Sequence, residues 1–476
     1  MRNRTTVYVA AVVVVIAAVV AVIVSTRGNT TTSTTTTTAS SGASAVTPAI
    51  LTNALTVKKV PASPLNMGGS SFDANLVNAA WTQWTGLSAH NASSLNTYQS
   101  SSSGTGRAGV DAATPSINIG FSDVPLNFAG QDVADTTKFV QVPIALGGVA
   151  VITNIRFKTS STVTNQFGTA TTTNVTSTGT TSGKSCAAQV ARTPVALDGT
   201  TLGNIFAGSI TTWNNAAVLA QNPALLVKVN VPVAGKDQLE SVNCLTLTTK
   251  ATIAVDSRTA GSGTTFIFRD YLAKVDPTQF PTASSAAFAS ASATFSTSAT
   301  LAPAVAGLDG SIGYVEYGYA LQNHLASLRL KNAAGMTVSL SAASVSAAAS
   351  AGLAAITANA SCPGGFSAAG PSTYSAAAVT TTCFSITDVN ADAAYPIAGF
   401  SYAIVPKAIA DATVATVTTK FLLYLSQSGA GTNSANTFGQ NLAAAQAYVP
   451  LPAADEVVSS GLIDQINAGA NMNATD

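Results

Sequence analysis

Strand-like and helix-like segments alternate along most of this 476-residue chain. Apolar residues recur at helical spacing from Phe72 to Trp84 and from Val414 to Ser426. Short apolar runs such as Val227–Val233 and Ser401–Val405 are instead typical of strands. This alternation favours helices packed on a sheet whose strands run mainly parallel, so we expect an α/β fold.

The N-terminus carries an apolar run that we expect to lie in a membrane. Val7–Val24 is uncharged, with Arg2 and Arg4 before it and Arg27 after it. A run of this length just spans a bilayer, and the preceding arginines place the N-terminus inside by the positive-inside rule. Because no small-residue cleavage site follows, an uncleaved signal anchor is the favoured interpretation, and a cleaved secretion signal is the alternative.

The segment that follows the apolar run has an unusual composition. Residues 28–46 are almost entirely Thr, Ser, Ala and Gly. Such a segment cannot bury enough apolar surface to fold. We therefore expect residues 28–58 to form a flexible stalk that tethers the rest of the chain just outside a membrane.

Charged residues make up only 9% of the chain, against about 25% in typical soluble proteins. Few carboxylates limit the self-repulsion that acid causes, so this composition suits an acidic exterior. A general bias toward Ala and Thr is the alternative explanation. The net charge of +1 gives no basis for nucleic-acid binding.

Four cysteines in an exported chain point to two disulfides, with about three possible pairings. Sequence proximity favours Cys362–Cys383, which leaves Cys186–Cys244. None of them lies in a C-x-x-C pair, and the chain has only two histidines, so a zinc site is not expected. The scarcity of histidine also argues against a Ser-His-Asp hydrolase.

The run from Arg258 to Phe268 has the chemistry of a site for a small oxyanion. Arg258 provides a planar, permanently charged fork, and Gly263 lets the backbone come close to a ligand. Ser262 and Thr264 offer hydroxyl donors, and the first N–H groups of the following helix point to the same place. The alternative is an ordinary Gly/Ser/Thr helix cap that binds nothing.

Six segments, taken in their order along the chain, resemble the phosphate-binding component of phosphate ABC importers. No single segment is decisive, but their shared order in an exported chain is. The resemblance covers roughly residues 62–155, 196–330 and 395–460. The segments are Gly69–Phe72, Ser122–Leu126, Leu202–Trp213, Gly261–Leu272, Ile312–Gln322 and Tyr395–Phe400.

The resemblance implies a two-lobed periplasmic binding-protein type II fold with a ligand cleft between the lobes. The chain is expected to cross between the lobes near Gly147–Asn154 and near Ala398–Ile404. The Thr-rich insertion of about 158–185 has almost no sequence periodicity and is expected to be a surface excursion, and residues 281–306 and 332–390 support no detailed prediction. The implied parts are an anchor at 1–27, a stalk at 28–58, a first lobe at 59–147 plus 400–476, and a second lobe at 148–399 with low-complexity insertions.

The resemblance also implies which residues bind the ligand. Asp123 is the implied buried acceptor, because a carboxylate repels an anion unless the ligand donates a proton to it. It therefore favours phosphate over fully ionised sulfate; the alternative for Asp123 is an ordinary turn or cap residue. The implied phosphate-binding residues are Ser71, Phe72, Ser103, Gly104, Asp123, Arg258, Ser262, Gly263 and Thr264.

One position departs from the family pattern. Two residues after the arginine, the family usually has an acidic residue that pairs with it, whereas this chain has Ala260. Arg258 is therefore expected to be less restrained and its pocket more positive. The change is either an adaptation to doubly protonated phosphate or a drift in ligand preference. Glu316, which lies among the tyrosines of residues 314–319, is interpreted as a brace of the hinge or the cleft.

Taken together, the resemblance implies an extracellular, membrane-tethered protein that closes on inorganic phosphate by hinge motion. It implies delivery of phosphate to the permease and ATPase subunits of an ABC importer, by a monomer without cofactor, metal or catalytic step. The alternatives are a cell-surface structural or adhesion protein that reuses the fold, and a binder of another oxyanion. A phosphate-ester hydrolase is disfavoured because no metal cluster or activated nucleophile is visible.

Overall fold

The computed structural model describes residues 54–55, 65–87, 98–112, 115–126, 138–158, 160–165, 168–173, 185–233, 236–358, 385–428 and 438–469. All of them belong to one unit, Ala43–Asp476. The expected anchor Val7–Val24, most of the expected stalk, and the pair Cys362 and Cys383 lie outside these residues. Within the described ranges, no helix has both the length and the apolar character needed to cross a membrane.

The main sheet has nine strands among the described residues, in the order β11-β10-β12-β4-β16-β3-β1-β2, with β13 paired to β4. We call β1, β2 and β3 with their helices the first half, and β10, β11 and β12 with theirs the second half. The strands are β1 (Met67–Ser70), β2 (Gln99–Ser101), β3 (Ile119–Ser122), β4 (Phe139–Asn154), β10 (Ala254–Arg258), β11 (Ala293–Phe295), β12 (Ser311–Glu316), β13 (Ala326–Ser327) and β16 (Ala398–Pro406).

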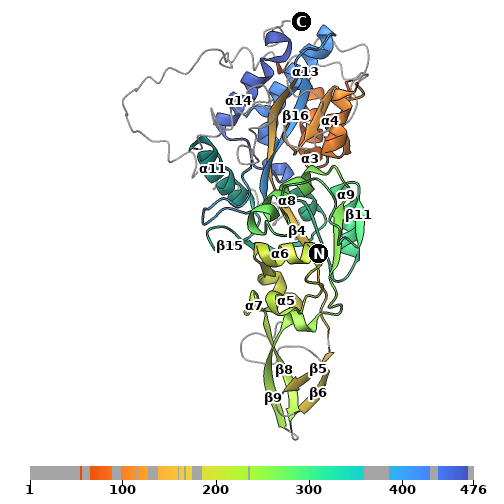
Figure 1. Ribbon diagram of the computed structural model, residues 1–476, viewed down its shortest axis with the longest axis vertical. Coiled ribbons are helices and arrows are strands. Elements are labelled where there is room, and N and C mark those ends of the chain that lie inside the picture. The colour runs from red at the N-terminus through yellow and green to blue at the C-terminus, as the bar shows by residue number, and fades with distance from the viewer. Residues whose placement is uncertain are drawn as a thin grey trace, which may run out of the picture. The chain divides into compact units, whose positions relative to one another are not determined.

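Two long central strands join the halves (Figure 1). Residues 139–148 of β4 pair with β16, and residues 149–154 continue into the second half, where they pair with β12. Pairing is parallel within each half, but β4 runs antiparallel to both β12 and β16, and β16 runs antiparallel to β3. The expectation of mainly parallel pairing therefore holds for each half and is wrong for the centre, because the chain that passes between the halves runs against their strands.

Helices pack on both halves of the sheet and bury aromatic rings against it. In the first half, the Trp81 ring of α3 meets the Phe421 ring of α13 edge-on, and the Trp84 ring lies tilted against both. Phe206 of α6, Phe268 of α8 and Tyr314 of β12 form a similar cluster in the second half. The main helices are α3 (Ala74–Thr85), α4 (Ser103–Asp111), α13 (Ala412–Ser426) and α14 (Ala453–Ile463) in the first half, and α6 (Gly199–Phe206), α7 (Ala216–Ala220), α8 (Gly263–Val275), α9 (Ser298–Gly307) and α10 (Tyr317–Gln322) in the second.

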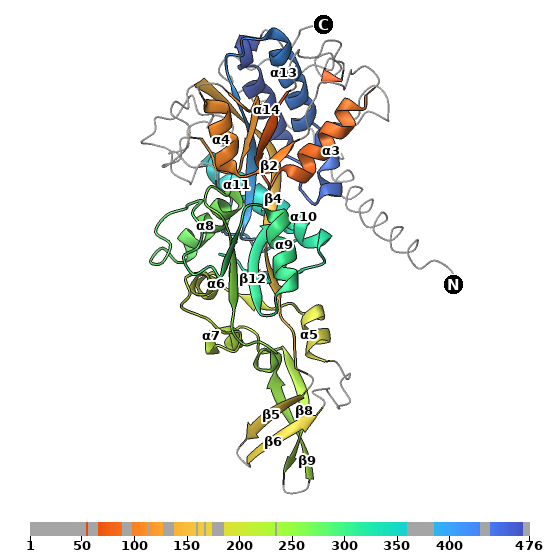
Figure 2. The ribbon, with the colours of Figure 1, turned by 90° about the vertical axis from the view of Figure 1, so that its right-hand side faces the viewer.

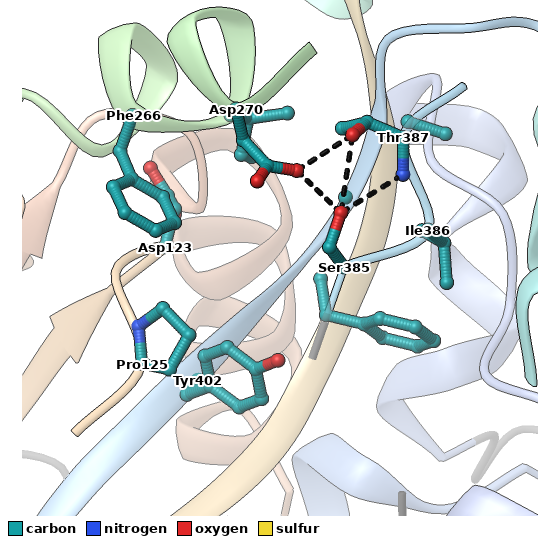
Figure 3. A pocket seen from close by; sticks show the side chains of 12 residues that line it. Asp123, Pro125, Phe266, Asp270, Ser385, Ile386, Thr387 and Tyr402 are labelled. Carbon is teal, nitrogen blue, oxygen red and sulfur yellow. Dashed lines mark hydrogen bonds between the residues drawn. The ribbon is translucent and has the colours of Figure 1, made fainter. Parts of the chain in front are cut away.

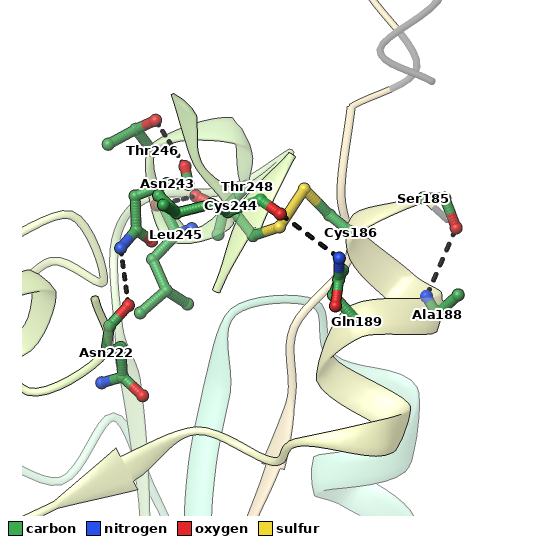
Figure 4. Close-up of a disulfide and its surroundings, with 11 residues drawn as sticks. Ser185, Cys186, Ala188, Gln189, Asn222, Asn243, Cys244, Leu245, Thr246 and Thr248 are labelled. Carbon is green, nitrogen blue, oxygen red and sulfur yellow. Dashed lines mark hydrogen bonds between the residues drawn. A yellow bond between two sulfur atoms is a disulfide. The ribbon is translucent and has the colours of Figure 1, made fainter. Parts of the chain in front are cut away.

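The disulfide region is our name for α5 (Cys186–Arg192), the 3₁₀ helix η3 (Cys244–Leu247) and two antiparallel ribbons. The ribbons are β5 (Ser160–Asn165) with β6 (Gly168–Thr173), and β8 (Leu226–Val233) with β9 (Lys236–Asn243). They lie together at the end away from α3 and α13 (Figure 2). A Cys186–Cys244 disulfide, one of the two expected, joins α5 to η3 (Figure 4). The insertion of about 158–185, for which the sequence has almost no periodicity, contains the paired strands β5 and β6.

Residues 332–390, for which the sequence supports no detailed prediction, contain the long helix α11 (Ala342–Ala358), which contacts β4 and β16. Alanine has the highest helix propensity, so this Ala/Ser-rich stretch can be helical without a strong apolar stripe. The remaining short elements are β7 (Ala196–Leu197), β14 (Arg329–Lys331) and β15 (Thr337–Val338), which form a small sheet, and the 3₁₀ helices η5 (Gly439–Leu442), η6 (Ala444–Gln446) and η7 (Ile466–Gly469).

Candidate anion-binding site

The candidate site lies where the parallel strands of both halves end. Ligand sites of open α/β sheets form at the carboxyl ends of the strands, because the loops that follow them converge there. All six outer strands deliver polar groups to this place, three from each half. The residues at or just after the strand ends are Ser70 and Ser71 (β1), Ser101 and Ser103 (β2), Asp123 (β3), Arg258 (β10), Ser296 and Ser298 (β11) and Glu316 (β12).

Three of the helices that begin at the site are capped by a hydroxyl. The N-cap Ser102 of α4 accepts a hydrogen bond from Thr105 N at 3.2 Å, and the N-cap Ser262 of α8 accepts one from Thr265 N at 3.3 Å. Helix α9, capped by Thr297, is the third. The first N–H groups of a helix have no partner within the helix and carry its positive dipole end. Three such ends at one place create a field that attracts an anion.

The first turns of α4 and α8 touch. Gly104 N donates to Gly261 O at 3.0 Å, so an implied ligand residue of the first half contacts the loop of the second. A Cβ added to Gly263 would lie 2.2 Å from Ser103 Oγ and 2.3 Å from Asp123 Oδ2. Only glycine therefore allows α8 to come this close to the first half.

Arg258 is the cation of the site and connects the two halves. Its side chain is 1% exposed. Nη1 donates to Ser71 Oγ and to Ser298 Oγ, both at 2.9 Å. Nη2 donates to Ser296 O at 2.7 Å and Ser101 O at 3.3 Å, and Nε donates to Phe295 O at 3.3 Å.

These contacts correct the expectation that Arg258 is less restrained because Ala260 replaces an acidic residue. Ala260 is exposed, and the guanidinium is held by backbone carbonyls and serine hydroxyls instead. Neutral acceptors fix the planar fork without cancelling its charge. Arg258 is therefore both restrained and electrically available to an anion.

Asp123 occupies a buried niche lined by serines. Ser70 Oγ donates to it at 2.6 Å and Ser103 Oγ at 3.4 Å, and Ser401 of β16 also donates to it. Burial raises the pKa of Asp123 to about 7, against the opposing effect of these hydroxyls. A carboxyl group that titrates near neutral pH can accept a proton from a ligand or hold one of its own.

Asp73 lies next to Asp123 and was not found from the sequence. It is the N-cap residue of α3, and it is fully buried. Ser401 Oγ also lies 2.8 Å from Asp73 Oδ2, so this one hydroxyl, whose single hydrogen serves one carboxyl group at a time, links the two. Burial, together with the nearby Asp123 carboxylate, raises the pKa of Asp73 well above its ordinary value.

The hydroxyls of Ser71 and Thr264 meet at Glu316. Its Oε1 accepts from Thr264 Oγ1 at 2.9 Å and from Ser71 Oγ at 3.3 Å. Since Ser71 belongs to the first half and Thr264 to the second, this carboxylate contacts both. The interpretation of Glu316 as a brace of the cleft agrees with these contacts, but they also place it among the implied ligand residues.

The structure thus brings the implied residues together, with one qualification for Phe72. Its ring is buried against Gly147 and contacts the Tyr448 ring edge-on at a centroid distance of 5.9 Å, so only its backbone can face the site. Its N–H donates to Ser70 Oγ at 3.1 Å.

Ser298 and Ser401 are among the contributors that the sequence did not predict. Ser298 lies in an Ala/Ser-rich stretch where no pattern distinguishes one serine from another. Ser401 could have been suspected, because it is the hydroxyl residue that begins an otherwise apolar predicted strand.

A pocket adjoins the Asp123 side of the site (Figure 3). Phe266 and Tyr402 form apolar walls, and Asp123 and Asp270 both line it. Asp270 Oδ2 accepts hydrogen bonds from the hydroxyls of Thr387, at 2.6 Å, and Ser385, so this oxygen is engaged locally. Asp123 is therefore the lining carboxyl group that also belongs to the anion site.

Known proteins with similar sequences or folds are consistent with this geometry. The family model of the PBP superfamily domain matches residues 25–428. The chain is 28% identical over 425 residues to the phosphate-binding protein PstS of Xylella fastidiosa strain Temecula1, over 86% of each chain. It is 28% identical over 302 residues to the phosphate-binding protein PstS of Haemophilus influenzae, over 62% of this chain and 72% of that protein.

Among solved structures, a phosphate-binding protein from Stenotrophomonas maltophilia superposes with a TM-score of 0.50 at 17% identity, over 86% of this chain and 97% of that one. At this identity the likeness supports the fold alone.

Proposed function

This chain belongs to the PBP superfamily, and from that premise we propose that it binds inorganic phosphate with high affinity outside the cell and passes it to an ABC-type importer. One observation carries the proposal most directly. A buried arginine, the first turns of three helices and a buried carboxyl group that titrates near neutral pH meet at the carboxyl ends of the strands. Relatives named phosphate-binding protein PstS support the choice of phosphate.

In this proposal most of the site residues donate hydrogen bonds to phosphate, and Asp123 accepts one from it. On binding, Arg258 and the hydroxyls of Ser71, Ser103 and Thr264 exchange acceptors that they contact in this structure for phosphate oxygens that carry negative charge. The helix N–H groups donate to the same oxygens. Asp123 accepts a hydrogen bond from a protonated phosphate oxygen. Fully ionised sulfate has no proton to give, so its oxygen would face the carboxylate unpaired, at a cost that discriminates against it.

The two halves of the sheet act as the two lobes of a type II binding protein in this proposal. The first lobe is 59–147 plus 400–476 and the second is 148–399, with the ligand cleft between them. The hydrogen bonds from Arg258 to Ser71 and Ser101 cross from one half to the other. A phosphate held by the same groups would stabilise the closed arrangement, so hinge closure would be coupled to binding.

The location follows from the N-terminal sequence. Val7–Val24 acts as a membrane anchor and residues 28–58 as a stalk, which keeps the binding unit at the extracellular face of the membrane. The partners in this proposal are the permease and ATPase subunits of the importer. The chain acts as a monomer, and the function includes no chemical step and no nucleic acid.

Isothermal titration of the full chain in mild detergent, with phosphate and with sulfate, tests the proposal. We expect tight phosphate binding and no measurable sulfate binding, and Arg258→Ala should weaken phosphate binding by about 100-fold or more. Arg192→Ala, an exposed arginine of α5, is the matched control and should bind as the wild type does. Absence of phosphate binding would contradict the proposal and favour a structural or adhesive role, whereas preference for another oxyanion would retain the site and change the ligand.

A further inference from the structure

Glu316 is a second carboxylate at the site that the proposed function does not yet use. It is 2% exposed, and its Oε1 accepts the hydroxyls of Ser71 and Thr264, both of which belong to the proposed phosphate site. It therefore approaches the ligand position from the second half, while Asp123 approaches it from the first.

The other carboxylate oxygen of Glu316, Oε2, lacks a hydrogen-bond partner among the described residues, which indicates a ligand. Oε2 is buried, and no group among the described residues donates a hydrogen bond to it. A buried acceptor without a donor costs free energy and is rare in native proteins. A donor supplied by a bound molecule would satisfy this oxygen.

The groups that face Glu316 come from several elements and carry more negative than positive charge. Asp73 precedes α3, Asp123 follows β3, Tyr319 lies on α10 and Tyr448 follows η6. Burial and the Glu316 carboxylate together raise the pKa of both tyrosines, so their hydroxyls stay neutral. Arg258 is the cation of this set. Because carboxylates outnumber cations around Glu316, an anion with protonated oxygens binds there more favourably than a fully ionised one.

On the basis of the proposed phosphate function, we infer that Glu316 is a second acceptor carboxylate that restricts the ligand to the monobasic form of phosphate. This form carries two P–OH groups, one for Asp123 and one for Glu316. An ionised carboxylate can only accept hydrogen bonds, so each of the two requires a protonated ligand oxygen. The two remaining oxygens of phosphate take the donors of Arg258, the helix N-termini and the hydroxyls.

This assignment also accounts for Ala260. The arginine has no acidic neighbour two residues later, but Ser71 Oγ both accepts from Arg258 and donates to Glu316. The acidic group on the Arg258 side of the site, Glu316, therefore comes from the end of β12 rather than from the loop after β10. In this position it faces the ligand instead of neutralising the arginine in a direct ion pair.

The inference has a measurable consequence in proton linkage. Above neutral pH, phosphate in solution is mainly dibasic and must take up a proton to bind between two carboxylates. Glu316→Gln keeps the shape and supplies an N–H donor, so this variant can hold the dibasic form. Wild type should therefore take up about one more proton on binding at pH ~8 than Glu316→Gln does, and its affinity should fall about tenfold more per pH unit.

The test is titration calorimetry of the full chain with inorganic phosphate from pH ~5 to ~9, in buffers that differ in ionisation enthalpy. Asp455→Asn, which alters a buried carboxylate of α14 that also has an unpartnered oxygen, is the matched control and should show wild-type proton uptake. If Glu316 only braces the fold, Glu316→Gln should weaken phosphate binding equally at every pH. In that case wild type and variant take up the same number of protons on binding, and this result would overturn the inference.

A second measurement needs no variant and so stands if Glu316→Gln fails to fold. The ³¹P resonance of phosphate bound to the wild type at pH ~8 should have the shift of the monobasic ion, and the dibasic shift would overturn the inference. The two proposals fail differently. Binding of phosphate without the extra proton contradicts only the role of Glu316, whereas absence of phosphate binding at every pH contradicts the proposed function and this inference together.

Discussion

The anion site and the disulfide region are held together in opposite ways. The site depends on contacts between residues far apart in the chain, such as the hydrogen bond between the buried side chains of Ser71 and Arg258. The disulfide region depends on strands that pair with near neighbours, β5 with β6 and β8 with β9, and on one covalent bond. The site therefore requires the two halves to lie close together, whereas we expect that the disulfide region can lose stability without moving a site residue.

Removing the disulfide should have the largest effect on stability and none on binding. The bond closes a loop with a sequence separation of 58, and loss of such a constraint costs about 4 kcal/mol in the chain-entropy account. The double variant Cys186→Ser, Cys244→Ser should therefore unfold at lower denaturant concentration, as followed by circular dichroism. Its phosphate affinity, measured where the protein is fully folded, should equal that of the wild type. A weaker affinity under those conditions would show that the two regions are coupled.

In contrast to removal of the disulfide, Gly263→Ala should strongly weaken phosphate binding. The new Cβ would collide with Ser103 and Asp123, so α8 must move away from the first half. Overpacking of this kind costs about 1–3 kcal/mol, and we expect phosphate affinity to fall by up to about 100-fold in calorimetry. Gly307→Ala, at the end of α9 where nothing lies within 4 Å, is the matched control. Equal affinities for the two variants would contradict the close approach of α8 to the site.

Asp123→Asn should change selectivity more than affinity. The amide can donate to an unprotonated oxygen, so sulfate no longer meets an unpaired carboxylate. We expect the ratio of phosphate to sulfate affinity to fall by about tenfold or more, measured by competition between the two ions. An unchanged ratio would show that discrimination arises elsewhere in the site.

The smallest expected effect is the pH dependence of stability without ligand. Burial raises the pKa of Asp73 and Asp123, so the folded protein binds more protons than the unfolded chain between their ordinary pKa near 4 and about 7. Stability therefore falls as pH rises through this window. Asp73→Asn should flatten the fall in melting temperature by about 2–4 °C. A melting temperature that rises from pH ~4 to ~7 would contradict this burial effect.

Much of the site was predictable because its residues lie in short local motifs. The Ser262-Gly263-Thr264 turn after Arg258 was identified as a helix start with anion chemistry, and α8 begins there, capped by Ser262. Asp123 was predicted as a buried acceptor, and it is buried. Such motifs survive in sequence because cap, turn and ligand chemistry are each set by a few adjacent residues.

The rest of the site could not be predicted because it depends on the meeting of distant segments. Asp73 looks like an ordinary helix-start residue until the fold places it against Asp123 and Ser401. Ser298 cannot be told apart from its neighbouring serines without the contact to Arg258. Likewise, β5 and β6 were missed because Thr-rich strands have no alternation of apolar and polar residues. The antiparallel centre of the sheet follows from the path of the chain rather than from any local pattern.

The most direct test of the central claim is a crystal structure of the protein grown with inorganic phosphate. The account predicts one phosphate ion between the two halves, within hydrogen-bonding distance of Arg258, Thr264 and Asp123, with the first-turn N–H groups of α4 and α8 directed at its oxygens. A phosphate bound elsewhere, or a site that stays empty at saturating phosphate while Arg258 still contacts Ser71, would contradict it.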